Sequence, residues 1–212
     1  MSKESQHEPQ EPTNRQKFIS TLVWLVGTVV VVLGVQQFLV KPFQIPSESM
    51  QPALNPGDRI MVGRLGALWP TPRLGQVVVF HPPQGAPGPQ EPMPRCGGQG
   101  GNGTDRICPQ PLGGAANQYF VKRIVALAGD RVAMKEGVLW RNGKPVKESY
   151  AQPCRIPEMC NFPKEITVPP GHVLTLGDNR ENSDDGRFWG PIKTDWIMAQ
   201  LLPNGGRLTG LA

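Results

Sequence analysis

Charged side chains are scarce in this chain, and histidine is scarcer still. Asp, Glu, Lys and Arg make up 18% of the 212 residues, and only His7, His81 and His172 could supply an imidazole. Glycine and proline are abundant by contrast, with 25 and 24 residues, about twice their usual combined frequency. This composition disfavours an all-helical fold and indicates one rich in loops.

The cysteines do not form the spacings of the common metal and redox motifs. Cys96 with Cys108 and Cys154 with Cys160 form two local pairs, and neither pair is a C-x-x-C. A zinc site and thioredoxin-like chemistry are therefore not expected, while disulfides and free thiols both remain open. The basic residues are scattered, so the net charge of +5 does not indicate nucleic-acid binding.

One long apolar run stands near the N-terminus. Residues 18–40 carry no charge, and a helix of this length spans ~35 Å against a ~30 Å hydrocarbon core. The apolar region of a cleavable signal peptide is about 7–15 residues and ends at a small-residue cleavage site, whereas this run continues into VKPFQIP. The run therefore predicts a transmembrane anchor. Residues 1–17 are rich in Gln, Glu and Ser, which predicts a disordered tail. The basic residues that flank the run weakly favour a cytoplasmic location for this tail.

The rest of the chain, residues 41–212, has the pattern of an antiparallel, mainly all-β domain. No sustained helical periodicity appears after the anchor, and Asn142-Gly143 predicts a hairpin turn. Residues 82–118 are almost half glycine and proline and predict a surface insertion without a packed core of its own. The clearest strand signals are at Ile60 with Val62, at 76–80, at 119–127 and at 173–180, where a strand runs into a polar loop.

Two serines stand one residue apart shortly after the anchor, in the stretch PSESM. Ser49 follows Val40 by nine positions, and Ser47 precedes it. A serine becomes a nucleophile only when a nearby base takes its proton. A Ser-His-Asp triad through His172 and Asp178 is one alternative, although neither residue has a recognisable catalytic context. The glycine-flanked nucleophile elbow and the S-x-x-K motif are both absent.

Lysine is the other candidate base. Lys122 interrupts the predicted strand at 119–127, where alternation places it on one face with Phe120, Ile124 and Ala126. Burial on that face would disfavour the ammonium form and lower its pKa, as a general base requires. The alternative is that the side chain extends along the sheet to solvent.

A polar cluster, GDNRENSDDGRFWG, occupies residues 177–190. It does not fit a calcium loop, because Arg180 stands at the third position from Asp178 and no glycine falls at the sixth. Asp185 and Arg187 could form an ion pair, and Ser183 could orient a lysine amine.

Taken together, these segments resemble the successive motifs of the type I signal peptidases, which are membrane-anchored Ser/Lys endopeptidases. PSESMQPAL with GDRIMV, then QVVVF, YFVKRIVALAGD and GDNRENSDDGRFWG follow in the family's order and cover most of residues 42–200. The insertion at 82–118 and the region of Cys154 and Cys160 are unmatched. The sequence departs from the family's pattern at four positions. In the R-G-D strand motif, Leu74 replaces the typical residue before the glycine and Gln76 replaces the usual aspartate. Ala128 stands where the family often has proline, and Gly186 replaces a frequent serine. Loss of the charge at 76 puts a turn interaction in doubt, and Gly186 is expected to loosen the wall near Ser183.

The resemblance implies a role for each matching residue. Ser49 would be the nucleophile and Lys122 its general base, while the Ser47 hydroxyl and the Ser49 backbone N–H would form the oxyanion hole. Three further residues would support the site: Ser183 by orienting the lysine, and Asp185 with Arg187 as an ion pair. Phe43, Ile45 and Val121 would line shallow substrate pockets.

The resemblance also implies a substrate and a location. The expected activity is removal of signal peptides from exported preproteins after A-x-A-like sites, without a cofactor or metal and without nucleic acid. The chain would be a monomeric, single-pass protein of the bacterial plasma membrane, in contact with the lipid bilayer, with its catalytic domain outside the cytoplasm. Two alternatives are a self-cleaving SOS-type repressor, which would need a DNA-binding domain, and a non-catalytic tethered β-domain that binds exported chains.

Overall fold

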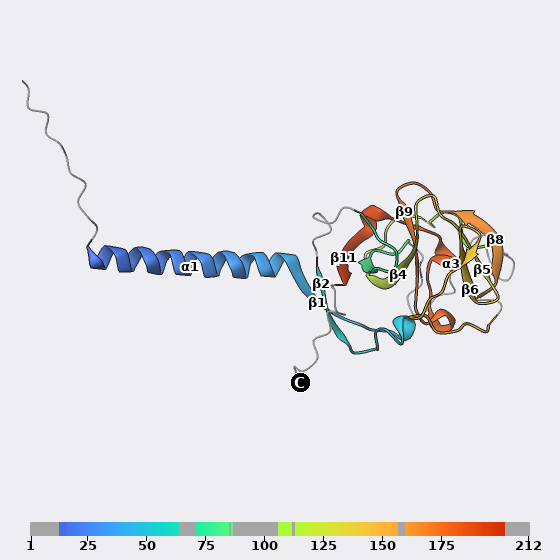
Figure 1. Ribbon diagram of the computed structural model, residues 1–212, viewed down its shortest axis with the longest axis horizontal. Helices are drawn as coiled ribbons and strands as arrows, with labels where there is room; N and C mark the ends of the chain where they lie inside the picture. Colours follow the sequence, from blue (N-terminus) through green and yellow to red (C-terminus); the bar gives the residue numbers. More distant parts are fainter. Residues whose placement is uncertain are drawn as a thin grey trace, which may run out of the picture. The chain divides into compact units, whose positions relative to one another are not determined.

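The computed structural model describes residues 13–63, 71–84, 86, 106–111, 113–156 and 160–201, and it divides into two units, Met1–Leu39 and Val40–Ala212 (Figure 1). The first unit contains helix α1 (Asn14–Leu39). Its segment Asn14–Gly34 has a mean hydropathy of 2.0 and is long and apolar enough to cross a membrane. Residues 14–17, predicted to be disordered, form the first turn of this helix, and residues 1–12 lie outside the described part.

The second unit is built on antiparallel sheets, as the alternation of apolar residues predicted. Its larger sheet has seven strands in the order β1-β2-β11-β3-β4-β9-β10. These strands are β1 (Val40–Gln44), β2 (Arg59–Gly63), β3 (Val77–Phe80), β4 (Phe120–Leu127), β9 (His172–Leu176), β10 (Ile192–Lys193) and β11 (Ile197–Leu201). Sequence reasoning had not identified β1, β10 or β11. Val40, the last residue of the predicted anchor, begins β1.

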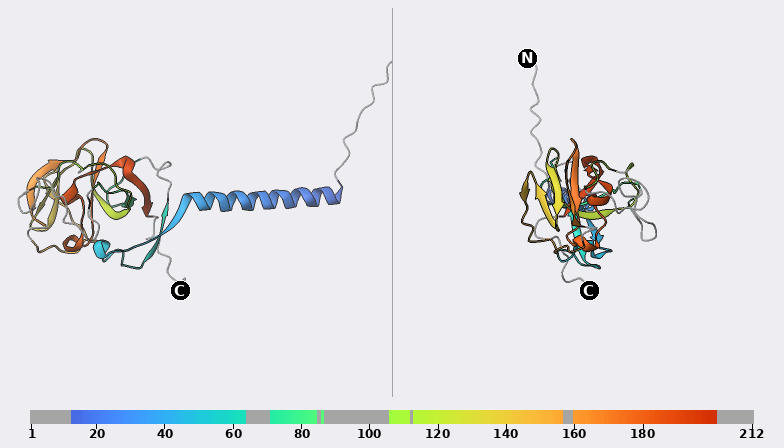
Figure 2. Two further views of the ribbon diagram at one scale, coloured as in Figure 1. Left: turned by 180° about the vertical axis from the view of Figure 1, so that it is seen from behind. Right: turned by 90° about the vertical axis from the view of Figure 1, so that its right-hand side faces the viewer.

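The smaller sheet has the order β7-β6-β5-β8 and stands beside the larger one (Figure 2, right, yellow and orange). Its strands are β5 (Arg131–Lys135), β6 (Val138–Arg141), β7 (Lys144–Pro145) and β8 (Phe162–Thr167). The predicted Asn142-Gly143 turn joins β6 to β7, and both residues have the positive φ, 54° and 77°, that this turn requires. The Asn142 side chain also accepts a hydrogen bond from Arg131 N (2.8 Å), which fixes the hairpin against β5.

Strand β3 is buried on both faces, as its unbroken apolar run predicted. Val77 and Val79 pack into one cluster with Ile45 and Met50, which follow β1. Val78 and Phe80 face the opposite side, in a second cluster with Trp189. A third cluster includes residues of both sheets and fills the space between them. The central strands are therefore held from both sides, which fixes the position of β4 beside β3.

Two expectations about the core were wrong. The register of β4 against β9 shifts between Ile124 and Ala126, so Val125 and Ala126 both pack into the cluster between the sheets while Ile124 packs elsewhere. A bulge adds one residue to a strand and ends strict alternation, so Ala126 does not follow the face predicted for it. Ile107, in the 82–118 insertion, is fully buried in the same cluster as Val125. The insertion thus contributes to the core instead of lying wholly on the surface.

One of the two cysteine pairs forms a disulfide in the structure. Cys154 and Cys160 are joined, and the loop they close follows β7 and leads into β8. Cys108 is also disulfide-bonded, whereas Cys96 lies outside the described residues.

Candidate active site

Ser49 lies on a single 3-10 turn, η1 (Glu48–Met50), which begins four residues after the end of β1 at Gln44. Met50 is buried in the cluster beneath the turn, which fixes one end of it. The Ser49 carbonyl accepts a hydrogen bond from Asn179 N (3.1 Å), so the turn is also attached to the loop after β9. Ser49 is only 8% exposed, yet its hydroxyl lines a pocket.

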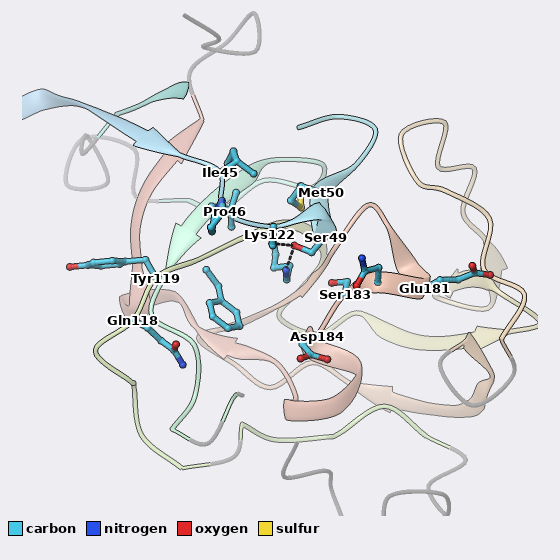
Figure 3. Close-up of a pocket in the computed structure, with 14 residues that line it drawn as sticks. Ile45, Pro46, Ser49, Met50, Gln118, Tyr119, Lys122, Glu181, Ser183 and Asp184 are labelled. Atoms are coloured by element: carbon cyan, nitrogen blue, oxygen red, sulfur yellow. Dashed lines mark hydrogen bonds between the residues drawn. The ribbon is translucent and has the colours of Figure 1, made fainter. Parts of the chain in front are cut away.

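Lys122 comes from the middle of β4, and its side chain reaches Ser49 on η1. Its Nζ lies 2.6 Å from Ser49 Oγ, and the two side chains point toward one another (Figure 3). Lys122 is 4% exposed, so its amine does not extend to solvent. Its Nζ also lies 5.6 Å from the centre of the Phe120 ring, as expected for two residues on one strand face. The structure therefore brings together the two residues that the sequence singled out.

Burial determines the charge state of Lys122. Desolvation lowers the pKa of its ammonium from the ordinary 10.5 to about 8, even though the carboxylates of Asp185 and Asp184 raise it. At pH 7 an amine with this pKa is neutral in about one molecule in ten, against about one in three thousand for an ordinary lysine. A neutral amine within hydrogen-bonding distance of a hydroxyl can accept its proton.

Ser47 stands beside the same hydroxyl. Its Oγ lies 3.2 Å from Ser49 Oγ, on the exposed side of the turn. Both serines and Lys122 border a pocket of about 570 Å³ that opens between η1, β4 and the loop after β9 (Figure 3). A pocket of this size falls within the usual range of ligand-binding sites.

Ser183 also lines this pocket, from the loop that follows η3 (Arg180–Asn182). It is 3% exposed, and its Oγ has no hydrogen-bond partner among the described residues. Gly177 lies behind it: a Cβ there would collide with the Ser183 side chain and with the Ser49 carbonyl oxygen. Gly177 thus permits the close approach of the loop carrying Ser183 to the turn carrying Ser49.

Asp185 and Arg187 form the buried ion pair that the sequence suggested. Arg187 Nε donates to Asp185 Oδ1 (2.8 Å) and Nη2 to Oδ2 (2.9 Å). The guanidinium also donates to the carbonyls of Arg180 (2.8 Å) and Ser183 (2.9 Å). Burial alone would raise the pKa of Asp185, but the charge and hydrogen bonds of Arg187 outweigh it and hold that pKa below its usual value. The pair fixes the backbone on both sides of Ser183.

Two departures from the family pattern have structural explanations. Gly186 opens the short helix α3 (Gly186–Trp189), and a Cβ there would lie 2.7 Å from Leu174 Cδ1 and 2.9 Å from the Thr175 carbonyl. The glycine therefore lets α3 pack closely on β9, while the expected loosening near Ser183 stays a prediction. Gln76 keeps a turn contact without a charge, because its Oε1 accepts from Arg73 N (3.2 Å).

The three residues expected to bind substrate fall into two places. Ile45 and Val121 border the large pocket beside Ser49. Phe43 borders a neighbouring pocket of about 170 Å³, and Tyr119 lines both. The expected substrate surface thus continues from one pocket to the next along β1 and β4.

The histidine alternative receives no support from the geometry. His172 Nδ1 lies 2.8 Å from the Pro170 carbonyl, and Asp178 forms a two-point ion pair with Arg123 at 2.8 and 2.6 Å. Neither residue lines the pocket at Ser49. Among the residues that the structure describes, no group of three or more His, Cys, Asp or Glu side chains could hold a metal ion.

Several supporting contacts were not foreseen from the sequence. Arg180 forms a buried ion pair with Glu148 (2.9 Å), and the Tyr150 ring packs under the Arg123 guanidinium at 4.1 Å. Asn182 Nδ2 donates to Glu48 Oε2 (2.9 Å). These partners are separated by many positions in the chain, so no local pattern could have shown them.

In comparisons with known proteins, this chain is similar to signal peptidases. Residues 18–202 match the family model described as signal peptidase, peptidase S26. The chain is 33% identical to the probable signal peptidase I-1 of Synechocystis sp., over 84% of this chain and 77% of the relative. It is 34% identical to signal peptidase I of Leptolyngbya laminosa, over 82% and 73%. It is 27% identical to signal peptidase IB of Staphylococcus aureus, over 88% of both chains.

Proposed function

This chain belongs to the family described as signal peptidase, peptidase S26. On that premise we propose that it uses Ser49 and neutral Lys122 to cleave exported preproteins. The observation that carries this proposal is the 2.6 Å separation of Lys122 Nζ and Ser49 Oγ, with both side chains buried at the edge of a large pocket. A nucleophile within hydrogen-bonding distance of its base is the arrangement that covalent catalysis needs.

The proposed reaction has two stages. Lys122 takes the Ser49 proton as Ser49 Oγ attacks the scissile carbonyl, and the negative charge develops on the carbonyl oxygen. The Ser47 hydroxyl and the Ser49 backbone N–H donate hydrogen bonds to that oxygen. When the C–N bond breaks, the lysine proton passes to the leaving amine. The neutral lysine then takes a proton from water as the water oxygen attacks the carbonyl of the acyl-enzyme. When the ester bond to Ser49 breaks, the lysine proton returns to Ser49 Oγ, and the signal peptide leaves with a new carboxylate.

Substrate preference would follow from the apolar surface beside the serine. Ile45 and Val121 border the pocket next to Ser49, and Phe43 borders the adjoining one. We assign to these residues the side chains at the first and third positions before the cut. An apolar lining without charged groups at these three positions suits small apolar side chains, as cleavage after A-x-A-like sites would require.

Helix α1 would serve as the membrane anchor. Its apolar segment is long enough to cross a bilayer, and Ser49 follows Val40 by only nine positions. We assign the N-terminus to the cytoplasm and the β domain to the outer side of a bacterial plasma membrane. The protein would be a monomer whose substrates are preproteins emerging from the bilayer.

Three further residues would support the catalytic pair. We assign to Ser183 the role of orienting the lysine amine, and to the ion pair of Asp185 with Arg187 the role of supporting this arrangement.

The decisive experiment uses the full chain in detergent. A preprotein with an A-x-A site is incubated with the parent, with Ser49→Ala and with Lys122→Ala, and the new N-terminus is sequenced. Cleavage after the motif is expected for the parent alone. Ser149→Ala and Lys135→Ala serve as matched controls, because Ser149 does not line the pocket and Lys135 lies on β5.

Two results would overturn the proposal. Undiminished cleavage by a folded Lys122→Ala variant would require a different base. Absence of cleavage by a folded parent, combined with measurable binding of the preprotein, would favour the non-catalytic binding domain instead.

A further inference from the structure

Three hydrogen bonds join the turn that carries Ser49 to the loop that precedes Ser183. Asn179 N donates to the Ser49 carbonyl (3.1 Å), and Asn179 Nδ2 donates to the Glu48 carbonyl (3.3 Å). Asn182 Nδ2 donates to the Glu48 carboxylate (2.9 Å). The first two bonds hold the backbone of η1, while the third holds a side chain.

The position of Glu48 makes this third bond important. Glu48 stands between Ser47 and Ser49, the two residues that would surround the oxyanion. A free carboxylate at this position could turn toward the charge that develops there and oppose it. Bound to Asn182, the carboxylate is directed to the loop of η3 and away from that charge.

The loop that carries Asn182 also lines the candidate active site. Asn182 is followed by Ser183, which lines the pocket, and then by Asp184 and Asp185, whose carboxylates raise the pKa of Lys122. Movement of η1 relative to this loop would change both the Ser49–Lys122 separation and the charges around the lysine. A displacement of about 1 Å in such a site can lower a rate by up to about a hundredfold.

We propose that Asn182 and Glu48 form a latch that positions the nucleophile turn and keeps the Glu48 charge away from the oxyanion hole. Both are positioning residues, since neither touches the reacting atoms. This inference rests on the proposed roles of Ser49 and Lys122 and adds a specific pair of residues to them.

Asn182→Asp tests the latch with a nearly isosteric change. The substituted carboxylate repels Glu48 in place of donating to it, so the turn loses one attachment and its acidic side chain is released. We expect kcat to fall about tenfold while KM changes by less than about twofold, because the alignment of bound substrate is affected more than its binding.

The pH dependence supplies a second readout. The charges of Asp185, Asp184 and Asp178 already raise the pKa of Lys122, and the charge of Arg187 lowers it. An added carboxylate, with Glu48 released, stabilises the ammonium form of Lys122 and raises its pKa. The acid limb of kcat/KM should therefore move to higher pH in Asn182→Asp, which a loss of folding stability alone would not produce.

The double variant Glu48→Gln/Asn182→Asp exchanges donor and acceptor. The glutamine amide can donate to the new aspartate, and the net charge equals that of the parent. We expect kcat to recover to within about threefold of the parent value, with the acid limb shifted back. Asn161→Asp is the matched control, since the side-chain oxygen of Asn161 only accepts from Glu136 N (3.3 Å) and aspartate can still accept.

The outcomes separate this inference from the proposed function. If Ser49→Ala is inactive while Asn182→Asp keeps the parent kcat and pH profile, the latch is wrong and the Ser/Lys chemistry stands. Failure of the double variant to recover, with its melting temperature equal to that of the parent, also overturns the latch. If the folded parent itself does not cleave, both proposals fail.

Discussion

Lys122 Nζ and Ser49 Oγ lie 2.6 Å apart, although 73 positions separate them in the sequence. Strand β4 holds the lysine and the turn after β1 holds the serine, and both side chains are almost completely buried. The protonation state of the buried Lys122 amine should therefore affect both the rate of cleavage and the stability of the fold, and both should depend on pH.

The rate of cleavage should depend on the neutral fraction of Lys122. Its lowered pKa of about 8 predicts that kcat/KM rises with pH through a midpoint near that value and then levels off. The sign follows from the mechanism, because only the neutral amine accepts the Ser49 proton. A pH–rate profile with a preprotein or a short peptide substrate measures it. A profile that stays flat between about pH 6 and about pH 9 would contradict a lysine base.

The same burial should make Lys122 a destabilising residue at neutral pH. The pKa of about 8 in the folded chain, against 10.5 for an ordinary lysine, corresponds to about 3 kcal/mol of lost stability when the amine is charged in the unfolded chain. Lys122→Met should therefore raise the free energy of unfolding while abolishing cleavage. The gain should be largest below pH 8 and should vanish above the ordinary pKa, where the amine is neutral in both states. Urea unfolding of the parent and the variant at several pH values tests this, and a gain independent of pH would contradict it.

Gly177→Ala should damage the active site more than the fold. The added methyl group would collide with the Ser183 side chain and the Ser49 carbonyl, so the turn and the loop must separate. A loss of at least about tenfold in kcat is expected, with a smaller relative effect on KM. Gly114→Ala is the control, because a Cβ there meets only ordinary contacts, the nearest at 3.6 Å from Gln84 Nε2. Equal activity in the two variants would show that the close approach is unimportant.

Arg187→Met should strongly destabilise the β domain. Asp185 is fully buried, and loss of its partner leaves a charge in the interior, which typically lowers stability by about 3–5 kcal/mol. Asp185→Asn/Arg187→Met should be more stable than the single variant, because the asparagine is neutral and keeps an acceptor for Gly177 N, now bonded at 3.0 Å. Thermal unfolding of both variants measures the difference. A single variant as stable as the parent would contradict the structural role of the pair.

The low pKa of Asp185 gives this ion pair a definite pH dependence. A carboxyl whose folded pKa lies below its unfolded value of 3.8 contributes stability above that value, and the contribution is lost as pH falls through the folded pKa. In Arg187→Met the aspartate can escape its unpaired charge by taking up a proton. The stability difference between parent and variant should therefore shrink under acid conditions.

The local sequence predicted much of this architecture. The uncharged run predicted a helix long enough for a bilayer, and the structure has such a helix at Asn14–Gly34. Apolar runs and the Asn142-Gly143 turn predicted strands β3, β4 and β9 and the β6–β7 hairpin. Strands β5 and β8 were missed, because their residues include several charged side chains at solvent positions and their pairing is non-local.

The sequence by itself determined which residues could do chemistry and that the second unit would be antiparallel β, because residue types and period-2 alternation are local properties. The tertiary structure alone decided that Lys122 is buried against Ser49, that a bulge moves Ala126 to another cluster, and that Asn182 reaches Glu48. It also decided that Gly186 lets α3 pack closely on β9. Burial, register and side-chain pairing arise from segments far apart in the chain, and so does the low lysine pKa that the reaction would require.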